Sequence, residues 1–309
     1  MDKFSLLNRI KQLYTEKNIN IIKFLKQECN ESSNDIADIL ISYDFQAGTY
    51  IKSFFENEQF YLNNLKPLAK IIDEIGDNCK SLLDCGTGEG SALLPLLKML
   101  KHRFEHVGGV DISWSRIKNA RLFSKSYSKE GMVDFVVGDM FCLPCADNSF
   151  DIVYTNHAIE PNGGKEKQIL RELYRVANKY LILVEPAYEL VDDPKIRRRM
   201  EEHGYVKNLY SSAKELGLDI ITWRLYDNSI SESNPSGLMI IKKNDNSNIA
   251  TGEWSCPLTK TKLTKYSGAY YSKESLLAYP IIGDVPLLTR DNAVVATKFI
   301  ELCEDESKV

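Results

Sequence analysis

The sequence predicts an α/β fold in which a Rossmann-like sheet carries helices on both faces. Two observations lead to this fold class. A glycine-rich turn at residues 84–90 separates a short apolar run from a helix-like apolar pattern, and strand and helix patterns then alternate to about residue 243. Such alternation builds a largely parallel sheet whose strands end along one edge, where α/β proteins bind their ligands.

The glycine turn follows the apolar run Leu82-Leu83, and apolar residues from Leu93 to Leu100 follow it at helical spacing. Its glycines allow backbone amides to approach a ligand closely. The third glycine comes one residue too early for a dinucleotide fingerprint, and no Lys-Ser/Thr pair closes a P-loop. The candidate cofactor contacts in this turn are Asp84, Gly86, Thr87, Gly88 and Gly90.

The charge of the turn indicates the class of cofactor. Asp84 precedes the turn and Glu89 lies within it. These carboxylates would repel a pyrophosphate and attract a cation. S-adenosylmethionine (SAM) has no phosphate and carries an ammonium and a sulfonium group, so the turn favours SAM.

Composition limits the class of protein. The chain has 309 residues, of which 43% are hydrophobic, and a formal net charge of −4. It is long enough for one large domain with additions or for two domains. The negative charge argues against a broad nucleic-acid surface, and no run resembles a signal peptide or a membrane span. We therefore expect a cytoplasmic protein that does not bind membranes.

The seven cysteines show no even spacing typical of a disulfide framework, which fits a reducing compartment. The pair Cys142 and Cys145 resembles half of a zinc or redox motif. A second cysteine pair or a nearby histidine pair is missing from the sequence around it. We expect no metal at this pair.

Residues 1–74 are expected to form a helical cap that acts as a substrate lid, because amphipathic patterns recur through them. The aromatic residues from Tyr43 onward allow two interpretations. Their rings could pack as core, or Tyr43, Gln46 and Tyr50 could form a roof over the active site. In the second case Tyr50 would contact the cofactor and Tyr43 and Gln46 the substrate, since aromatic faces attract a sulfonium.

Two further strands end in aspartates. The run Val107–Asp111 places Asp111 25 residues beyond Gly86, where a carboxylate can bind both hydroxyls of a ribose, with Ile112 beside it. The run Val133–Asp139 ends in Gly138-Asp139. We expect Asp139 to accept a hydrogen bond from the adenine amino group and Met140 to donate its backbone amide to the ring.

The fourth strand, Phe150–Asn156, ends beside the cofactor strand and leads into the polar loop 157–164. Asn156 is a candidate cofactor contact, His157 and Glu160 are candidate bases, and Asn162 is a candidate substrate contact. Histidines in such loops are as often structural as catalytic. A helix at 165–177 and a strand at 180–185 follow, and Tyr188 begins the next loop as a further substrate candidate.

Residues 192–216 contain three consecutive arginines and then His203-Gly-Tyr205. Arg198 could bind an anionic substrate, although such a run is more often a solvated helix face. His203 is a third candidate base, and Tyr205 is a candidate substrate contact in a lid. Strands at 219–226 and 237–243 follow, and residues 244–248 are expected to form a linker.

Together these motifs resemble the class I SAM-dependent methyltransferases over residues 75–243. The resemblance implies a seven-stranded sheet whose last strand runs antiparallel, with SAM lying across the ends of the first strands. By position, Gly86 and Gly88 would face the methionine part, Asp111 the ribose and Asp139 the adenine. Residues 156–160 would lie near the transferable methyl group.

Residues 250–300 resemble the small zinc-ribbon-type module that accompanies some tRNA and protein methyltransferases. Thr259 stands where that module has the second cysteine after Cys256, and the next cysteine is Cys303. We therefore expect the module to be metal-free and held by hydrophobic packing. The residues expected in that packing are Leu258, Leu263, Tyr279, Ile281 and Leu287.

The sequence thus predicts a SAM-dependent methyltransferase that acts on oxygen or nitrogen of a polar small molecule, such as a sugar or nucleotide-sugar, and releases S-adenosylhomocysteine. Two alternatives stay open. The acceptor could be tRNA or a protein, or the chain could bind SAM without catalysis. The acceptor, the need for a base and the oligomeric state do not follow from the sequence.

Overall fold

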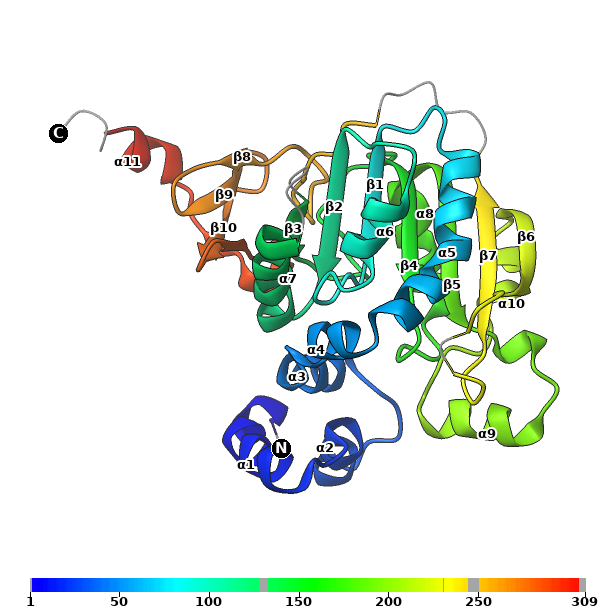
Figure 1. Cartoon of the computed structure of the whole chain (residues 1–309). Coiled ribbons are helices and arrows are strands. Elements are labelled where there is room, and N and C mark those ends of the chain that lie inside the picture. The colour runs from blue at the N-terminus through cyan, green and yellow to red at the C-terminus, as the bar shows by residue number, and fades with distance from the viewer. Residues whose placement is uncertain (1, 128–132, 230, 244–249, 306–309) are drawn as a thin grey trace.

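A computed structural model describes residues 2–127, 133–229, 231–243 and 250–305. Its centre is a seven-stranded sheet in the order β3-β2-β1-β4-β5-β7-β6 (Figure 1). The first five strands in this order are parallel, and β7 runs antiparallel to both of its neighbours. The strands are β1 (Ser81–Cys85), β2 (His106–Asp111), β3 (Asp134–Val137), β4 (Phe150–Asn156), β5 (Ala177–Pro186), β6 (Asp219–Leu225) and β7 (Ser236–Lys242). This confirms the predicted sheet and its antiparallel strand.

Helices cover both faces of the sheet. Neighbouring residues of a strand point to opposite faces, so the apolar side chains on each face are buried by helices. In β1, Leu82 belongs to the core beneath α5, α6 and α7, whereas Leu83 belongs to the core beneath α8 and α10. Both side chains are fully buried. The helices are α5 (Glu58–Ile75), α6 (Leu93–Met99), α7 (Trp114–Tyr127), α8 (Glu166–Val176), α9 (Pro194–Glu202) and α10 (Leu209–Glu215).

The N-terminal residues form a helical cap that ends near residue 56, earlier than the expected residue 74, because α5 packs on the sheet. It lies below the carboxyl ends of the strands in Figure 1 and has a small apolar core of its own around Ile10 and Leu25. Both interpretations of its aromatic residues apply, because Phe54 is buried in the main core while Tyr43 and Tyr50 line a cavity. The cap comprises η1 (Lys3–Leu6), α1 (Leu7–Lys17), α2 (Ile21–Cys29), α3 (Ile36–Phe45) and α4 (Thr49–Glu56).

The C-terminal residues form a small β-rich module at the β3 edge of the sheet (Figure 1). The Leu288 amide donates to the Val137 carbonyl at 2.7 Å, and Trp254 packs against Phe150 with ring centroids 5.9 Å apart. A Cβ on Gly108 would lie 2.9 Å from the Trp254 ring, so the glycine in β2 makes room for this side chain. The elements are β8 (Thr264–Lys265), β9 (Ala269–Ser272), β10 (Leu277–Ile282), β11 (Val285–Pro286), η3 (Arg290–Asn292), β12 (Val294–Val295) and α11 (Phe299–Asp305).

The residues predicted to hold this module divide into two groups. Leu263, Tyr279 and Leu287 are buried, but the prediction for Leu258 is wrong, since its side chain is 43% exposed, and Ile281 is only half-buried. The buried three join the cores of the sheet, while Ala269, Tyr271 and Ala278 form a small cluster within the module. The predicted linker 244–248 lies outside the described residues. No described helix has both the length and the apolar character that crossing a membrane requires.

Trp254→Ala is expected to lower the free energy of unfolding by about 3–5 kcal/mol, because it leaves a cavity where the module meets the sheet. Urea unfolding followed by circular dichroism measures this. The matched control is Leu258→Ala in the same module, with an expected change within about 0.5 kcal/mol. Separate unfolding steps for module and sheet, with only the first step responding to the substitution, would contradict a shared core.

Candidate cofactor and acceptor site

The glycine turn lies at the carboxyl end of β1, between β2 and β4. Gly86 and Gly88 have φ values of 81° and 55°, in the left-handed region that favours glycine. A Cβ on Gly86 would lie 2.2 Å from the Ala158 Cβ, so the loop after β4 approaches the turn closely. The turn therefore forms a cradle that a larger residue would fill.

The three aspartates that end consecutive strands line one cavity, as predicted. Asp111 accepts hydrogen bonds from the amides of Gly88, at 3.0 Å, and Ser113, at 2.9 Å. Asp139 accepts from the amide of Phe141 at 2.8 Å. These bonds orient the carboxylates, and Asp111 thereby also holds the glycine turn in place.

Asp84 is the most deeply buried of the three, with 3% of its surface exposed. Burial raises its pKa to about 7, and the neighbouring hydroxyl groups of Tyr154 and Thr87 only partly oppose this shift. Burial also raises the pKa of Asp139. Buried carboxyl groups without a cation favour the protonated form, and a cationic ligand favours the ionised form.

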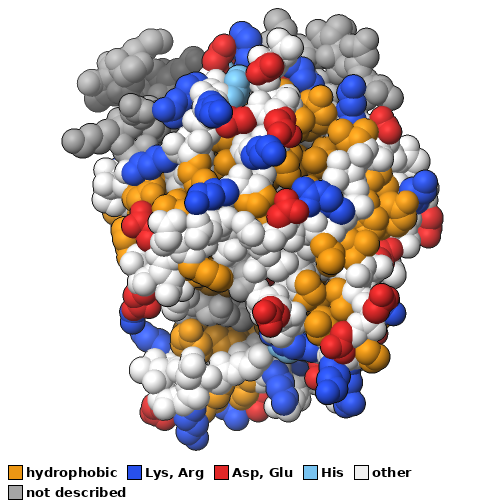
Figure 2. Space-filling model, turned by 45° about the vertical axis from the view of Figure 1, so that its right-hand side comes forward, with side chains coloured by type: hydrophobic (Ala, Val, Ile, Leu, Met, Phe, Trp, Pro, Cys, Tyr) orange, Lys and Arg blue, Asp and Glu red, His pale blue; other side chains and the backbone are white. Residues whose placement is uncertain are grey.

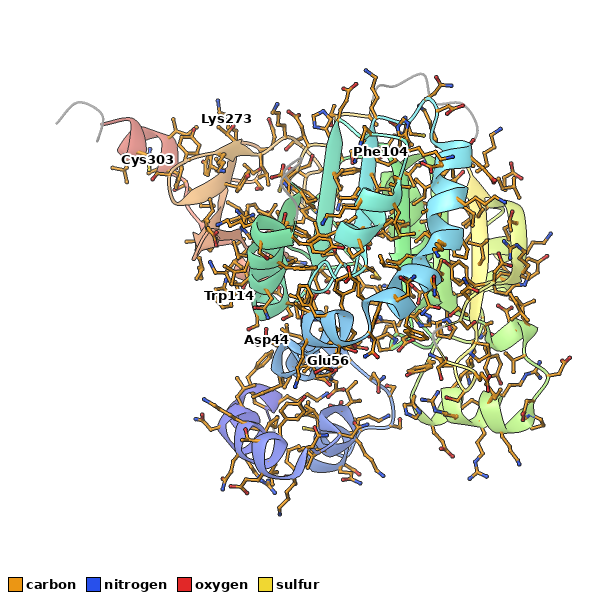
Figure 3. All side chains as sticks on the ribbon, in the orientation of Figure 1. Asp44, Glu56, Phe104, Trp114, Lys273 and Cys303 are labelled. Atoms are coloured by element: carbon orange, nitrogen blue, oxygen red, sulfur yellow. The ribbon has the colours of Figure 1, made fainter. Side chains whose placement is uncertain are left out.

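Two carboxylates attach the helical cap to the rest of the site, one from the glycine turn and one from the cap itself. Glu89 accepts hydrogen bonds from the cap amides of Gly48, at 2.7 Å, and Ile51, at 3.0 Å. In the other direction, Asp44 of the cap accepts from the hydroxyls of Ser113 and Ser115 at 2.6 and 3.0 Å. Figure 3 labels Asp44 where the cap meets the start of α7. The roof of the cavity is thus joined to its floor by charged hydrogen bonds.

The roof carries Tyr43 and Tyr50. Both rings lie beside the guanidinium of Arg116, with Cζ 5.1 and 4.4 Å from the two ring centroids. Arg116 comes from the first turn of α7 and is 8% exposed. Its Nη1 lies 4.0 Å from an Asp111 oxygen, so a cation lies between the roof and the ribose-side carboxylate.

The loop after β4 places a hydrogen-bonded chain at the other side of the cavity. His157 Nδ1 lies 2.8 Å from Glu160, and its Nε2 lies 2.7 Å from the hydroxyl of Ser236 in β7. His157 has a φ of 54°, so backbone conformation as well as side-chain bonds fixes its position. Burial lowers the pKa of His157, but the hydrogen bond and charge of Glu160 outweigh burial and leave the pKa raised.

Glu185 supports this loop from below. One of its oxygens accepts from the amides of Ala158 and Ile159 at 3.0 and 3.2 Å. Burial raises the pKa of Glu185 to about 7, and the positive charge of His157 partly opposes the shift. Since both ring nitrogens of His157 have partners, Glu160 is the better candidate for a base that meets an acceptor.

The cavity has a volume of about 280 Å³. It contains most of the predicted site residues, which come from the cap, the glycine turn and the ends of β2, β3 and β4. The predicted residues that line it are Tyr43, Tyr50, Asp84, Gly86, Thr87, Gly88, Asp111, Ile112, Gly138, Asp139, Met140, Asn156, His157, Glu160 and Asn162.

A larger groove of about 1340 Å³ continues from the cavity between the cap and the segment after α9. Tyr43, Tyr50, Glu160 and Pro161 line both hollows. Three predicted residues lie in this groove instead of the cavity. These are Gln46, His203 and Tyr205.

The remaining predictions need correction. Gly90 faces Phe135 and Leu94 in the core and does not line the cavity. Tyr188 donates to Glu201, and Arg198 is 80% exposed and pairs with Glu202, so α9 keeps both side chains out of the two hollows. His203, whose Nδ1 lies 2.8 Å from the Arg199 carbonyl, ends α9 and lines the groove but not the cavity. None of the three arginines lines either hollow, because Arg198 faces solvent while Arg197 and Arg199 are half-buried against the Tyr188 ring and the Ser233 carbonyl.

Sequence reasoning missed four parts of the site. Arg116 carried a usable signal, because it is in the first turn of the helix that follows Asp111. The sequence showed that Glu89 adds negative charge to the turn, but not that it accepts hydrogen bonds from the cap. Ser236 and the apolar wall gave no local signal, since the fold brings them in from distant segments. That wall includes Ile36, Ile39, Tyr61, Leu65, Phe141 and Tyr226.

The residues present fit SAM. The glycine cradle admits a ligand close to the backbone, and the buried carboxylates suit its cationic groups and its ribose. Arg116 Nε is buried at the cavity without a hydrogen-bond partner among the described residues. An orphaned donor at a cavity is open to a polar ligand.

Parts of the chain are similar to known methyltransferases. Residues 83–183 match a family model described as a methyltransferase domain. The chain is 35% identical over 109 residues to norajmaline N-methyltransferase of Rauvolfia serpentina, which covers 35% of this chain and 36% of that protein. It is 29% identical over 124 residues to 24-methylenesterol C-methyltransferase 2 of Arabidopsis thaliana, and this match covers 40% of this chain and 33% of that protein. The chain therefore spans about a third of the length of these curated relatives.

A solved structure shares the fold. It belongs to a complex between the Haloferax volcanii Trm112 methyltransferase activator and a methyltransferase, with a TM-score of 0.52 and 15% identity. The match covers 67% of this chain and all of that one.

The affinity for S-adenosylhomocysteine is expected to rise about tenfold between pH 6 and 8, because Asp84, with a pKa of about 7, must lose its proton to bind an ammonium. Calorimetric titration measures this. The protein without ligand should lose stability as pH rises from about 4 to 7, since the folded state holds the Asp84 proton longer than the unfolded chain does. A pH-independent affinity in wild type would contradict the role of Asp84.

Asp111→Ala is expected to weaken binding of S-adenosylhomocysteine by about 1–3 kcal/mol, the scale of hydrogen bonds to charged groups. The control is Asp147→Ala, whose carboxylate is exposed and pairs with Arg175 outside the cavity. Unchanged affinity in the Asp111 variant would remove the ribose assignment.

Proposed function

We propose that this chain, whose residues 83–183 match a methyltransferase domain, moves a methyl group from SAM to oxygen or nitrogen of a small molecule. The observation that carries the proposal is the position of Glu160. It lines both the cofactor cavity and the larger groove, on the same loop that touches Gly86 through Ala158. An acceptor entering by the groove meets this carboxylate next to the expected methionine end of SAM.

Bound SAM supplies an activated methyl group, and the new bond to the acceptor forms as the carbon–sulfur bond breaks. The chain's own residues position the acceptor and remove its proton. Glu160 takes that proton, while His157 and Asn234 donate hydrogen bonds to Glu160 and hold it in place. Ser236 fixes the far side of the His157 ring. Positioning of this kind is worth about 7–11 kcal/mol in favourable cases.

The lining supports an acceptor with an apolar body and one reactive hydroxyl or amine. Ile36, Ile39 and Leu65 form an apolar wall, and Arg116 is the only Lys or Arg among the described residues that line the cavity. The arginine run that motivated a phosphate-bearing acceptor lies on the surface of α9. An uncharged acceptor with a hydroxyl or an amine is therefore favoured over a nucleotide-sugar.

The alternatives of a tRNA or protein acceptor have weaker support. The net charge is −4, and on the face drawn in Figure 2 basic side chains alternate with acidic ones. RNA binding depends on a continuous basic surface. A cytoplasmic location stays a prediction, as does the zinc-ribbon-like character of the C-terminal module.

Incubation of cell extract with labelled SAM and this protein is expected to give a labelled product of low molecular weight. Glu160→Gln should slow its formation by about 10²–10⁴-fold through loss of the base. The control is Glu201→Gln on α9, which bonds Tyr188 outside both hollows and should leave the rate unchanged. Label in RNA or protein would favour the first alternative, and tight SAM binding without any labelled product would favour a non-catalytic protein.

A further inference from the structure

The carboxylate of the cofactor poses an electrostatic problem in this cavity. SAM carries a carboxylate at its amino-acid end, whereas the cavity is lined by Asp84, Glu89, Asp111, Asp139 and Glu160. These groups suit an ammonium, a sulfonium and a ribose, but they repel a carboxylate. A buried anion needs a positively charged partner.

Arg116 is the group that meets this need. Its side chain is 8% exposed, and its Nε has no hydrogen-bond partner among the described residues. The ion pair with Asp111 is long, at 4.0 Å, and both oxygens of Glu89 are taken by amides of the cap. The guanidinium therefore has donors left for a ligand.

The position of the guanidinium is fixed by neighbours on three sides. A Cβ on Gly88 would lie 2.9 Å from Nη2, so Arg116 lies directly over the turn that is expected to face the methionine part. Tyr43 and Tyr50 hold it from the roof. Below, the Arg116 amide donates to the Ser113 hydroxyl at 3.1 Å, and that hydroxyl donates to Asp44.

We propose that Arg116 binds the carboxylate of the cofactor and makes this pocket selective for ligands that carry it. The inference rests on the proposed function, since it takes SAM as the ligand. A guanidinium can donate two parallel hydrogen bonds to a carboxylate, which adds directional selectivity to the charge.

The test compares SAM with decarboxylated SAM, which differ only in the carboxylate, by calorimetric titration of wild type and Arg116→Gln. The variant is expected to bind SAM ten- to a hundredfold more weakly. Its affinity for decarboxylated SAM should be unchanged or higher, because loss of the guanidinium relieves repulsion of a more cationic ligand. Arg116→Lys should recover part of the loss for SAM.

The matched control is Arg121→Gln on the same helix, which contacts the Phe135 carbonyl and Asp284 outside the cavity and should bind both ligands as wild type does. Equal losses for the two ligands in Arg116→Gln would overturn the proposal, as would tighter binding of decarboxylated SAM by wild type. If Arg116→Gln does not fold, the Lys variant gives the same comparison, with a loss confined to SAM expected. Failure of wild type to bind either ligand would instead contradict the proposed function.

Discussion

The site depends on carboxylates buried at one edge of a parallel sheet. Asp84, Asp111 and Asp139 end three neighbouring strands, and parallel strands bring their carboxyl ends to the same side. Burial disfavours their charged forms, which is why the pKa of Asp84 reaches about 7. A bound cation offsets the free-energy cost of burying these carboxylates. The same carboxylates therefore destabilise the empty protein and favour a cationic nucleoside.

The helical cap is part of this electrostatic arrangement and not a separate lid. Glu89 binds two cap amides, and Asp44 of the cap binds two serines at the start of α7. Between these links lies Arg116, against Tyr43 and Tyr50. The groove that leads to Glu160 runs under the same helices. The proposed cofactor and acceptor sites thus share a roof, and a shift of the cap would change both sites together.

The C-terminal module stabilises the opposite flank of the sheet. It continues the β3 edge through Leu288 and fills the space over Gly108 with Trp254. Three basic residues of α7 surround Asp284, and Lys118 in particular lowers the pKa of that carboxyl group. Helix α7 is therefore held by the cap at its first turn and by the module along its outer side, and this is the helix that carries Arg116.

The sequence by itself determined the sheet, its strand ends and the class of ligand, because these depend on local patterns. Apolar periodicity indicated the strands and helices. The glycines indicated a ligand that approaches the backbone closely, and the aspartates indicated that this ligand is cationic. Gly90 was misplaced because the same pattern serves both the cradle and the packing of a helix on Phe135. The arginine run on α9 was ambiguous because a pattern of charges does not show which side chains are exposed to solvent.

Only the tertiary structure decided which distant side chains meet. Ser236 joins His157 across 79 positions of sequence, and Glu89 reaches cap amides about 40 residues away. Arg116 enters the cavity only because the cap and the glycine turn enclose it. Such contacts depend on how helices pack over the sheet, and packing is set by the shapes of many residues together and not by any short stretch of the chain.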